Sequence, residues 1–237
     1  MIQVIPSKQR HHANHGWLDT HWHFSFGDYH DEKNMNWGAL RVFNDDIIQG
    51  GGGFDFHPHR DMEIVTVVLR GSLEHQDNLG NKGTIEPGEV QVMSAGKGIY
   101  HSEQNHSEKL PLHLLQLWIL PRHRGNAPRW EQKHFDRRQR LDKLFPVVSG
   151  GDVADTLTID QNAQIYLSSL SKDHHLAHAI HPARKGYLFV IAGEIDLNGK
   201  KLVKGDQAKI AEETELKFSA RKDSELIFLD LPEMKIV

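Results

Sequence analysis

Short apolar segments with a two-residue period recur along the chain and are separated by glycine-containing turns. Five of them stand out, at 63–69, 112–120, 164–170, 187–191 and 225–229. Segments of this kind, rich in β-branched residues, predict strands rather than helices. Many short strands joined by glycine turns are typical of a β-sandwich or barrel. The charged stretch 129–141 is the main exception, and we expect a short connecting helix there.

One strand–turn–strand pattern occurs twice. Residues 67–74 (VVLRGSLE) resemble residues 189–196 (FVIAGEID), and each segment is followed by a second glycine turn, at Gly88 and at Gly205. A chance likeness between glycine turns is the alternative, but repetition of a whole supersecondary unit favours duplication. We therefore predict an all-β protein of two similar barrels, residues 1–135 and 136–237, with the seam near 133–145.

The composition limits the chemistry that the chain can perform. Its 237 residues include 18 His and no Cys, and the formal charge is −4. Disulfides, thiolate metal sites and cysteine nucleophiles are therefore excluded, which leaves imidazole and carboxylate for any metal chemistry. The mild negative charge argues against direct nucleic-acid binding. No segment reads as a signal peptide or a membrane span, so we expect no membrane contact and a cytoplasmic location.

The densest group of metal-binding residue types lies in GGGFDFHPHRDME, residues 51–63. Alternate residues of a strand share a face, so His57, His59 and, if the strand is unbroken, Glu63 point to the same side. A second segment places His101 and Glu103 two residues apart as well. Two strands of one barrel could bring these imidazoles and a carboxylate around one point. Such donors suit Fe(II), and also Mn, Ni, Cu or Zn.

Other histidines serve as comparisons. His21 and His23 form a second His-x-His pair, but it lacks the glycine-rich lead-in, the later carboxylate and a partner segment, so we expect packing or hydrogen bonding there. In the second repeat, counting back from Gly193 as from Gly71 leaves only His181 at a ligand position. One imidazole does not hold a metal, and we therefore predict a C-terminal barrel without one.

These motifs resemble those of the cupin superfamily, and their flanks resemble more specifically the pirin family. Gly51-x5-His57-x-His59-x3-Glu63-x7-Gly71 is similar to the first cupin motif. Gly88, followed by Gly98-x2-His101-x3-Asn105, is similar to the second. The segments that resemble pirins lie between about residues 12 and 130, and they are HGWLD (15–19), FSF (24–26), LRVFND (40–45), HPHRDME (57–63) and MSAGKG with HSE (93–98 and 101–103).

The resemblance implies a bicupin, two tandem antiparallel jelly-roll barrels packed together. It further implies one Fe(II) site in the first barrel, held by His57, His59, His101 and Glu103. The general cupin pattern would instead use Glu63 as the carboxylate ligand, and spacing alone does not choose between the two. We assign the carboxylate ligand to Glu103 because pirin-like sequences have a His-x-Glu there. We place Glu63 outside the ligand set, where it would orient an imidazole by accepting its free N–H.

Pirin-like proteins are associated with oxidative ring opening of flavonols such as quercetin. The resemblance thus implies a mononuclear iron dioxygenase that acts on a small aromatic substrate with O₂ and releases CO. In this interpretation Glu103, provided that it swings off the metal, takes the proton of the flavonol 3-hydroxyl, and Glu63 is the second candidate. The base must lie within hydrogen-bond reach of that hydroxyl.

Two other functions are consistent with the same resemblance. Relatives act as iron-dependent co-regulators, so a redox-sensing regulatory protein that binds a transcription factor or enzyme partner is the main alternative. A different cupin activity with Zn or Mn, such as sugar isomerisation, is the third, because one fold hosts many reactions. Turnover of a flavonol, partner capture without turnover, and activity with Zn²⁺ in the absence of O₂ would distinguish them.

Overall fold

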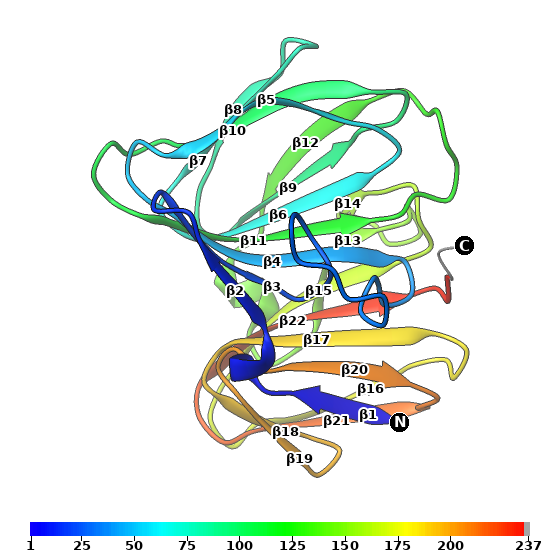
Figure 1. The fold of residues 1–237 in the computed structure, drawn as a ribbon. Helices are drawn as coiled ribbons and strands as arrows, with labels where there is room; N and C mark the ends of the chain where they lie inside the picture. The colour runs from blue at the N-terminus through cyan, green and yellow to red at the C-terminus, as the bar shows by residue number, and fades with distance from the viewer. Residues whose placement is uncertain (235–237) are drawn as a thin grey trace.

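The computed structural model describes residues 1–234 and consists almost wholly of β-strands. Figure 1 shows two barrels, one above the other, with the N-terminal half of the chain in the upper barrel and the C-terminal half in the lower one. The predicted all-β architecture of two tandem barrels is therefore confirmed. Within residues 1–234, no helix has the length and apolar character needed to cross a membrane.

Each barrel combines a seven-stranded and a four-stranded sheet. The large sheet of the upper barrel contains, in spatial order, β12 (Arg129–His134), β9 (Glu89–Ser94), β6 (Glu63–Arg70), β11 (Leu112–Ile119), β4 (Leu40–Ile48), β3 (Leu18–Trp22) and β2 (His11–Asn14). Its small sheet contains β5 (Gly53–His59), β10 (Ile99–Asn105), β7 (Leu73–Asp77) and β8 (Lys82–Ile85).

The lower barrel has the same two kinds of sheet. Its large sheet contains, in spatial order, β1 (Ile2–Ile5), β20 (Gln207–Ala211), β17 (Lys185–Ala192), β22 (Ser224–Leu231), β15 (Gln164–Leu170), β13 (Phe145–Ser149) and β14 (Leu157–Thr158). Its small sheet contains β16 (His175–Ala179), β21 (Glu215–Ala220), β18 (Glu194–Leu197) and β19 (Lys200–Val203). Two 3-10 turns complete the described elements, η1 (Ser7–Gln9) and η2 (Arg137–Arg140).

The two halves share one strand topology. The neighbours β9, β6, β11 and β4 of the upper barrel correspond to β20, β17, β22 and β15 of the lower one. The small sheets correspond as well, with the order β5-β10-β7-β8 against β16-β21-β18-β19. The repeated glycine turns in the sequence lie at equivalent places in this topology, between β6 and β7 and between β17 and β18.

The first strand does not follow the division at residue 135. β1 pairs antiparallel with β20 of the lower barrel, and Ile2 lies opposite Ile210. It takes the place beside β20 that β12 takes beside β9 in the upper barrel. The units 1–135 and 136–237 remain our interpretation of the chain, but residues 2–5 belong to the second large sheet.

The helix expected over 129–141 is largely wrong. Residues 129–134 form β12, and only the single turn η2 is helical. Trp130 packs against the core of the upper barrel, and Gln132 on the same face donates to the Thr84 carbonyl oxygen at 3.2 Å. The two-residue period of a strand is thus present, but polar side chains obscure it. η2 begins after Asp136, which forms a capping box with Gln139.

The two large sheets pack face to face and bury a shared core. β6 is an almost continuous apolar run because both of its faces are covered. Val65 and Val67 belong to the cluster between the barrels, together with Ile227 of β22, whereas Ile64 and Val68 belong to clusters inside the upper barrel. Full burial of such a side chain stabilises a fold by about 1.5–3 kcal/mol. The contact between the two barrels is therefore a buried apolar core that stabilises the fold.

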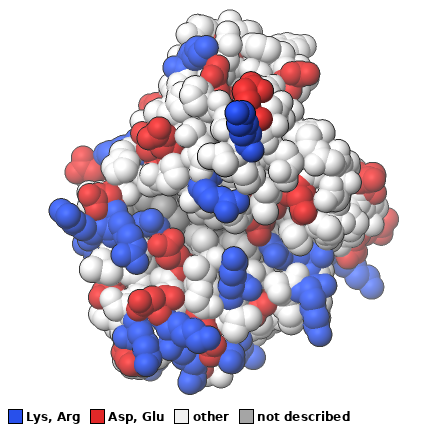
Figure 2. Space-filling model, turned by 90° about the vertical axis from the view of Figure 1, so that its left-hand side faces the viewer, with Lys and Arg blue, Asp and Glu red and all other residues white. Residues whose placement is uncertain are grey.

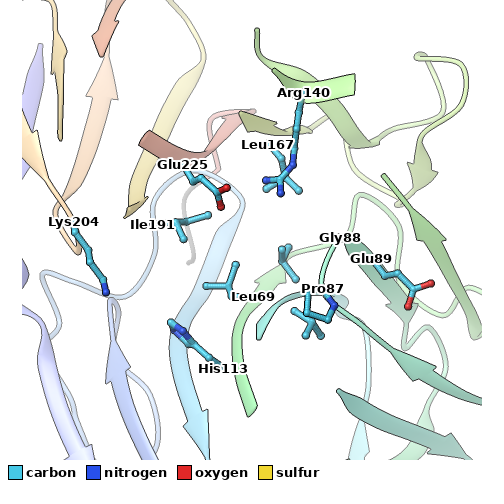
Figure 3. Close-up of a pocket in the computed structure, with 12 residues that line it drawn as sticks. Leu69, Pro87, Gly88, Glu89, His113, Arg140, Leu167, Ile191, Lys204 and Glu225 are labelled. Carbon is cyan, nitrogen blue, oxygen red and sulfur yellow. The ribbon is translucent and has the colours of Figure 1, made fainter. Parts of the chain in front are cut away.

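A cavity of about 190 Å³ remains at one rim of this interface (Figure 3). Leu69, Leu167 and Ile191 contribute apolar lining, and Arg140 and Glu225 carry opposite charges across from one another. Both groups of metal-ligand side chains found in residues 1–234 lie elsewhere. We therefore assign no metal to this cavity.

Candidate metal centre

The pairing of β5 with β10 assembles three histidines inside the upper barrel. The antiparallel register sets His57 directly opposite His101, and His59 follows two residues later on the same face of β5. The three ring centroids lie 4.4–4.9 Å apart, and one ligand nitrogen from each ring lies within 4.8 Å of the others. Pro58 fits between the two histidines because β5 is an edge strand, where a missing N–H breaks no ladder.

A fourth histidine, which was not predicted from the sequence, joins the group. His75 of β7 pairs with Glu103 of β10, and His75, His101 and Glu103 form a second set whose ligand atoms lie within 4.8 Å. The His75 ring stacks on Trp130 at 5.1 Å between centroids, and its Nε2 lies 3.5 Å from Asp77 Oδ2. The sequence did contain a signal for His75. In LEHQD, residues 73–77, alternate residues share a face of the strand, so His75 lies on the same face as the apolar Leu73.

Glu103 is buried and held by side-chain donors. Its Oε1 accepts from Gln91 Nε2 at 2.8 Å, and its Oε2 accepts from Gln116 Nε2 at 2.7 Å. Thr66 Oγ1 is a third, longer contact at 3.5 Å. Gln91 is in turn fixed by Trp130, whose Nε1 donates to Gln91 Oε1 at 2.7 Å. The carboxylate therefore has a defined orientation next to the histidines, as a ligating carboxylate needs.

Glu63 lies elsewhere, and its expected place beside the histidines is wrong. The strand breaks after His59: Asp61 has a φ of +48°, and the chain turns from the small sheet into the large one. On β6, Thr66 faces Glu103, so Glu63 points to the other face. There its Oε2 accepts from Ser94 Oγ at 2.5 Å. Burial raises the pKa of Glu63 to about 7.

The buried histidines of the cluster are short of hydrogen-bond partners. Burial, with the nearby imidazoles, lowers the pKa of His59 and of His101 to about 3. His57 Nδ1 donates to the Asp55 carbonyl oxygen at 2.8 Å, which leaves Nε2 as its ligand atom. His59 Nε2 and both ring nitrogens of His75 and His101 are buried without a hydrogen-bond partner. Neutral imidazoles with unpaired nitrogens beside an oriented carboxylate fit a divalent metal.

A largely apolar cavity of about 150 Å³ adjoins this cluster. His57, His59 and Glu103 line it on one side, and Trp118 packs edge-on against His59 at 4.8 Å between centroids. The remaining lining residues are Leu18, Trp22, Phe26, Asn44, Asp46, Phe54 and Gln116. A metal held by the histidines would therefore face a space walled by aromatic side chains.

The His21–His23 pair behaves as expected for packing and hydrogen bonding. His23 is buried between the barrels, stacks on Phe43 at 4.5 Å and hydrogen-bonds through Nδ1 to the Tyr187 hydroxyl at 2.8 Å. Its Nε2 accepts from Arg10 Nη1 at 3.3 Å. His21 stacks on His12. Neither His21 nor His23 belongs to a ligand group.

The counting that singled out His181 in the lower barrel is wrong. The link between β16 and β17 is longer than that between β5 and β6, so His181 lies outside the strands. His178 instead packs near Tyr166 and Phe228. Within residues 1–234, no group of ligand side chains forms in this barrel. The prediction that it binds no metal stays a prediction.

The surface charge is mixed on the face shown in Figure 2, where Lys and Arg side chains alternate with Asp and Glu over both barrels. Binding of a nucleic-acid backbone relies on a basic stripe that neutralises several phosphates. This face has no such stripe.

Comparison with known proteins follows the same division into two barrels. Residues 5–119 match the family model for pirin, and residues 146–231 match that for the quercetinase C-terminal cupin domain. The chain is 44% identical over 234 residues to quercetin 2,3-dioxygenase of Escherichia coli K12, covering 98% of this chain and 99% of that one. The chain belongs to the pirin family.

Other pirins agree with this assignment. The chain is 44% identical to a pirin-like protein of Caulobacter vibrioides, over 97% of this chain and 99% of that one. The crystal structure of the bacterial pirin YhhW from E. coli in complex with nickel(II) is 42% identical, with a TM-score of 0.94 over 99% of this chain and 100% of that one. Full-length likeness to relatives with these names supports a pirin- or quercetinase-like function.

Proposed function

We propose that this pirin is a mononuclear iron dioxygenase that opens the ring of flavonols such as quercetin with O₂ and releases CO. The proposal is supported by two overlapping ligand groups, His57 with His59 and His101, and His101 with His75 and Glu103. Of these residues, His57, His59 and Glu103 line the aromatic-walled cavity. Relatives named quercetin 2,3-dioxygenase at 44% identity support the substrate class.

In this proposal His57, His59, His101 and Glu103 would hold the metal. The His75 ring lies next to that of His101. Iron bound there supplies a redox-active Lewis acid with positions left open for substrate and O₂. The protein contributes orientation: Gln91 and Gln116 fix the Glu103 carboxylate. Holding both reactants in one small space removes the entropic cost of their meeting.

The cavity suits one aromatic ring. Its volume of about 150 Å³ is below the roughly 300–1,000 Å³ of pockets that enclose whole drug-sized ligands. We therefore propose that one hydroxylated outer ring of the flavonol enters between Trp22, Phe54 and Trp118, with the neighbouring 3-hydroxyl edge toward the histidines, and that the rest of the molecule extends toward the mouth. Apolar walls also exclude water, which strengthens electrostatic interactions at the reacting atoms.

The proton of the flavonol 3-hydroxyl needs an acceptor, and we assign it to Glu103. Of the two carboxylates considered from the sequence, Glu103 lines the cavity, whereas Glu63 hydrogen-bonds to Ser94 on the other face of β6. Glu63 is therefore withdrawn as a base. A proton acceptor must lie within hydrogen-bond reach of the group that it deprotonates.

The test is O₂-dependent loss of quercetin with Fe(II)-reconstituted and metal-stripped protein, with CO measured in the headspace. We expect loss of quercetin with CO release only in the Fe(II) sample. No turnover at stoichiometric iron would refute the proposal. In that case the regulatory alternative would be examined next, through partner capture that depends on the oxidation state of the iron.

A further inference from the structure

Two polar side chains face the same cavity from β4, away from the histidines. Asn44 and Asp46 are separated by one residue, share a face of the strand and are 5% and 3% exposed. Both line the cavity that His57 and His59 line. Asn44 lies opposite Gln116 in the β4–β11 register, and Gln116 donates to Glu103. The pair is therefore one strand away from the metal-binding carboxylate.

Neither side chain has its hydrogen-bonding capacity filled. Asn44 Oδ1 is buried without a partner, and no side-chain hydrogen bond of Asn44 is present in the part of the chain that the structure describes. Asp46 accepts from Thr20 Oγ1, the one side-chain donor to it within residues 1–234. Leaving a buried acceptor unpaired is costly. A bound ligand with hydrogen-bond donors would pair with these buried acceptors and remove that cost.

The surroundings indicate what kind of ligand supplies them. Trp22, Phe26, Phe54 and Trp118 make the neighbouring walls aromatic, and such walls favour a flat aromatic ring. Asn44 Oδ1 and the Asp46 carboxyl are hydrogen-bond acceptors, so the ring must carry donors at its edge. Aromatic hydroxyl groups satisfy both conditions.

We propose that Asn44 and Asp46 accept hydrogen bonds from ring hydroxyls of the substrate other than the 3-hydroxyl, and thereby select polyhydroxylated flavonols. The inference rests on the proposed function for its substrate class and deepens it. A site built to pair with a hydroxyl discriminates against the analogue that lacks it, because its buried acceptors are then left unpaired. The two residues are specificity-determining, and no metal ligation is assigned to them.

The test compares quercetin with 3-hydroxyflavone, which keeps the 3-hydroxyl and lacks the others. Binding to Ni(II)-loaded protein under nitrogen is followed by quenching of tryptophan fluorescence, so that affinity is measured without turnover. We expect wild type to favour quercetin by about tenfold, the effect of two ordinary hydrogen bonds. Asn44→Leu and Asp46→Leu each remove one of these bonds and should reduce the preference to about threefold, and the double variant should abolish it. Asp46→Asn keeps an acceptor oxygen and should retain it.

Nickel content and melting temperature show whether each variant keeps its site and its fold. If both leucine variants retain the tenfold preference, or if wild type shows none, the inference is overturned, even where quercetin turnover upholds the dioxygenase. If no flavonol is turned over but the preference is present in wild type, reduced in each leucine variant and lost in the double variant, the inference stands and the dioxygenase fails. If Asp46→Asn loses the preference while Asp46→Leu keeps it, the acceptor role is refuted.

Discussion

Replacing Glu63 by Gln should change how the stability of this pirin depends on pH while leaving the metal site intact. Glu63 faces away from the histidines and is 2% exposed, with Ser94 Oγ donating to its Oε2. Glutamine has nearly the same shape and offers Ser94 a carbonyl oxygen in place of the carboxylate. The substitution therefore removes the ionisation of this side chain and little else.

The magnitude follows from the pKa of Glu63. Burial, the largest influence, raises this pKa from 4.5 to about 7, against the opposing effects of the Ser94 hydrogen bond and Arg129. Between these two pH values the folded protein retains a proton that the unfolded chain has lost. The stability that this proton contributes is full below pH 4.5 and is lost as the pH rises to about 7. The loss corresponds to about 3 kcal/mol.

Urea denaturation of metal-free wild type and Glu63→Gln over a range of about pH 4 to 8 measures the effect. Because every other ionisable group is present in both proteins, the difference in unfolding free energy isolates Glu63. The variant should match wild type at the acidic end and exceed its stability by about 3 kcal/mol at the basic end. A difference independent of pH would refute the reasoning about its pKa. A loss of metal uptake would refute its placement.

Three further predictions concern the metal site and the junction between the barrels. His101→Ala should abolish metal uptake, whereas His23→Ala should leave it intact; metal analysis after reconstitution tests both, and equal loss would mean that the site is misplaced. Gln116→Leu removes a donor to Glu103 and should weaken metal binding by about 10–100-fold in chelator competition; unchanged affinity would show that the carboxylate needs no such support. Tyr187→Phe deprives His23 Nδ1 of its partner and should destabilise the protein by about 1–3 kcal/mol in urea, and an effect near zero would contradict that role.

Local periodicity was enough to predict much of this structure. The β-branched run at 63–69 and the run at 164–170 are strands because alternation within a strand needs no knowledge of its neighbours. The same reasoning placed His57 and His59 on one face, and the structure brings them to His101. The repeated glycine turns pointed to two barrels for an equally local reason.

The errors arose where the outcome depended on one residue or on a distant partner. Asp61, in the left-handed region, ends β5 and separates the faces of His59 and Glu63, which simple counting had joined. His75 reaches the site from a third strand, whose register with β10 no local pattern reveals. In β12, charged neighbours hide the alternation of Trp130 and Gln132.

The placement of β1 also has a consequence for the order of events during synthesis. The hydrogen bond from the Met1 amino group to the Ala211 carbonyl oxygen joins groups 210 positions apart. At about 5–20 residues per second, a ribosome adds β20 roughly 10–40 s after β1. The last strand of the upper barrel, β12, is made within that interval, before β20 becomes available to pair with β1. A strand made before those of the upper barrel is thus needed to complete the large sheet of the lower barrel.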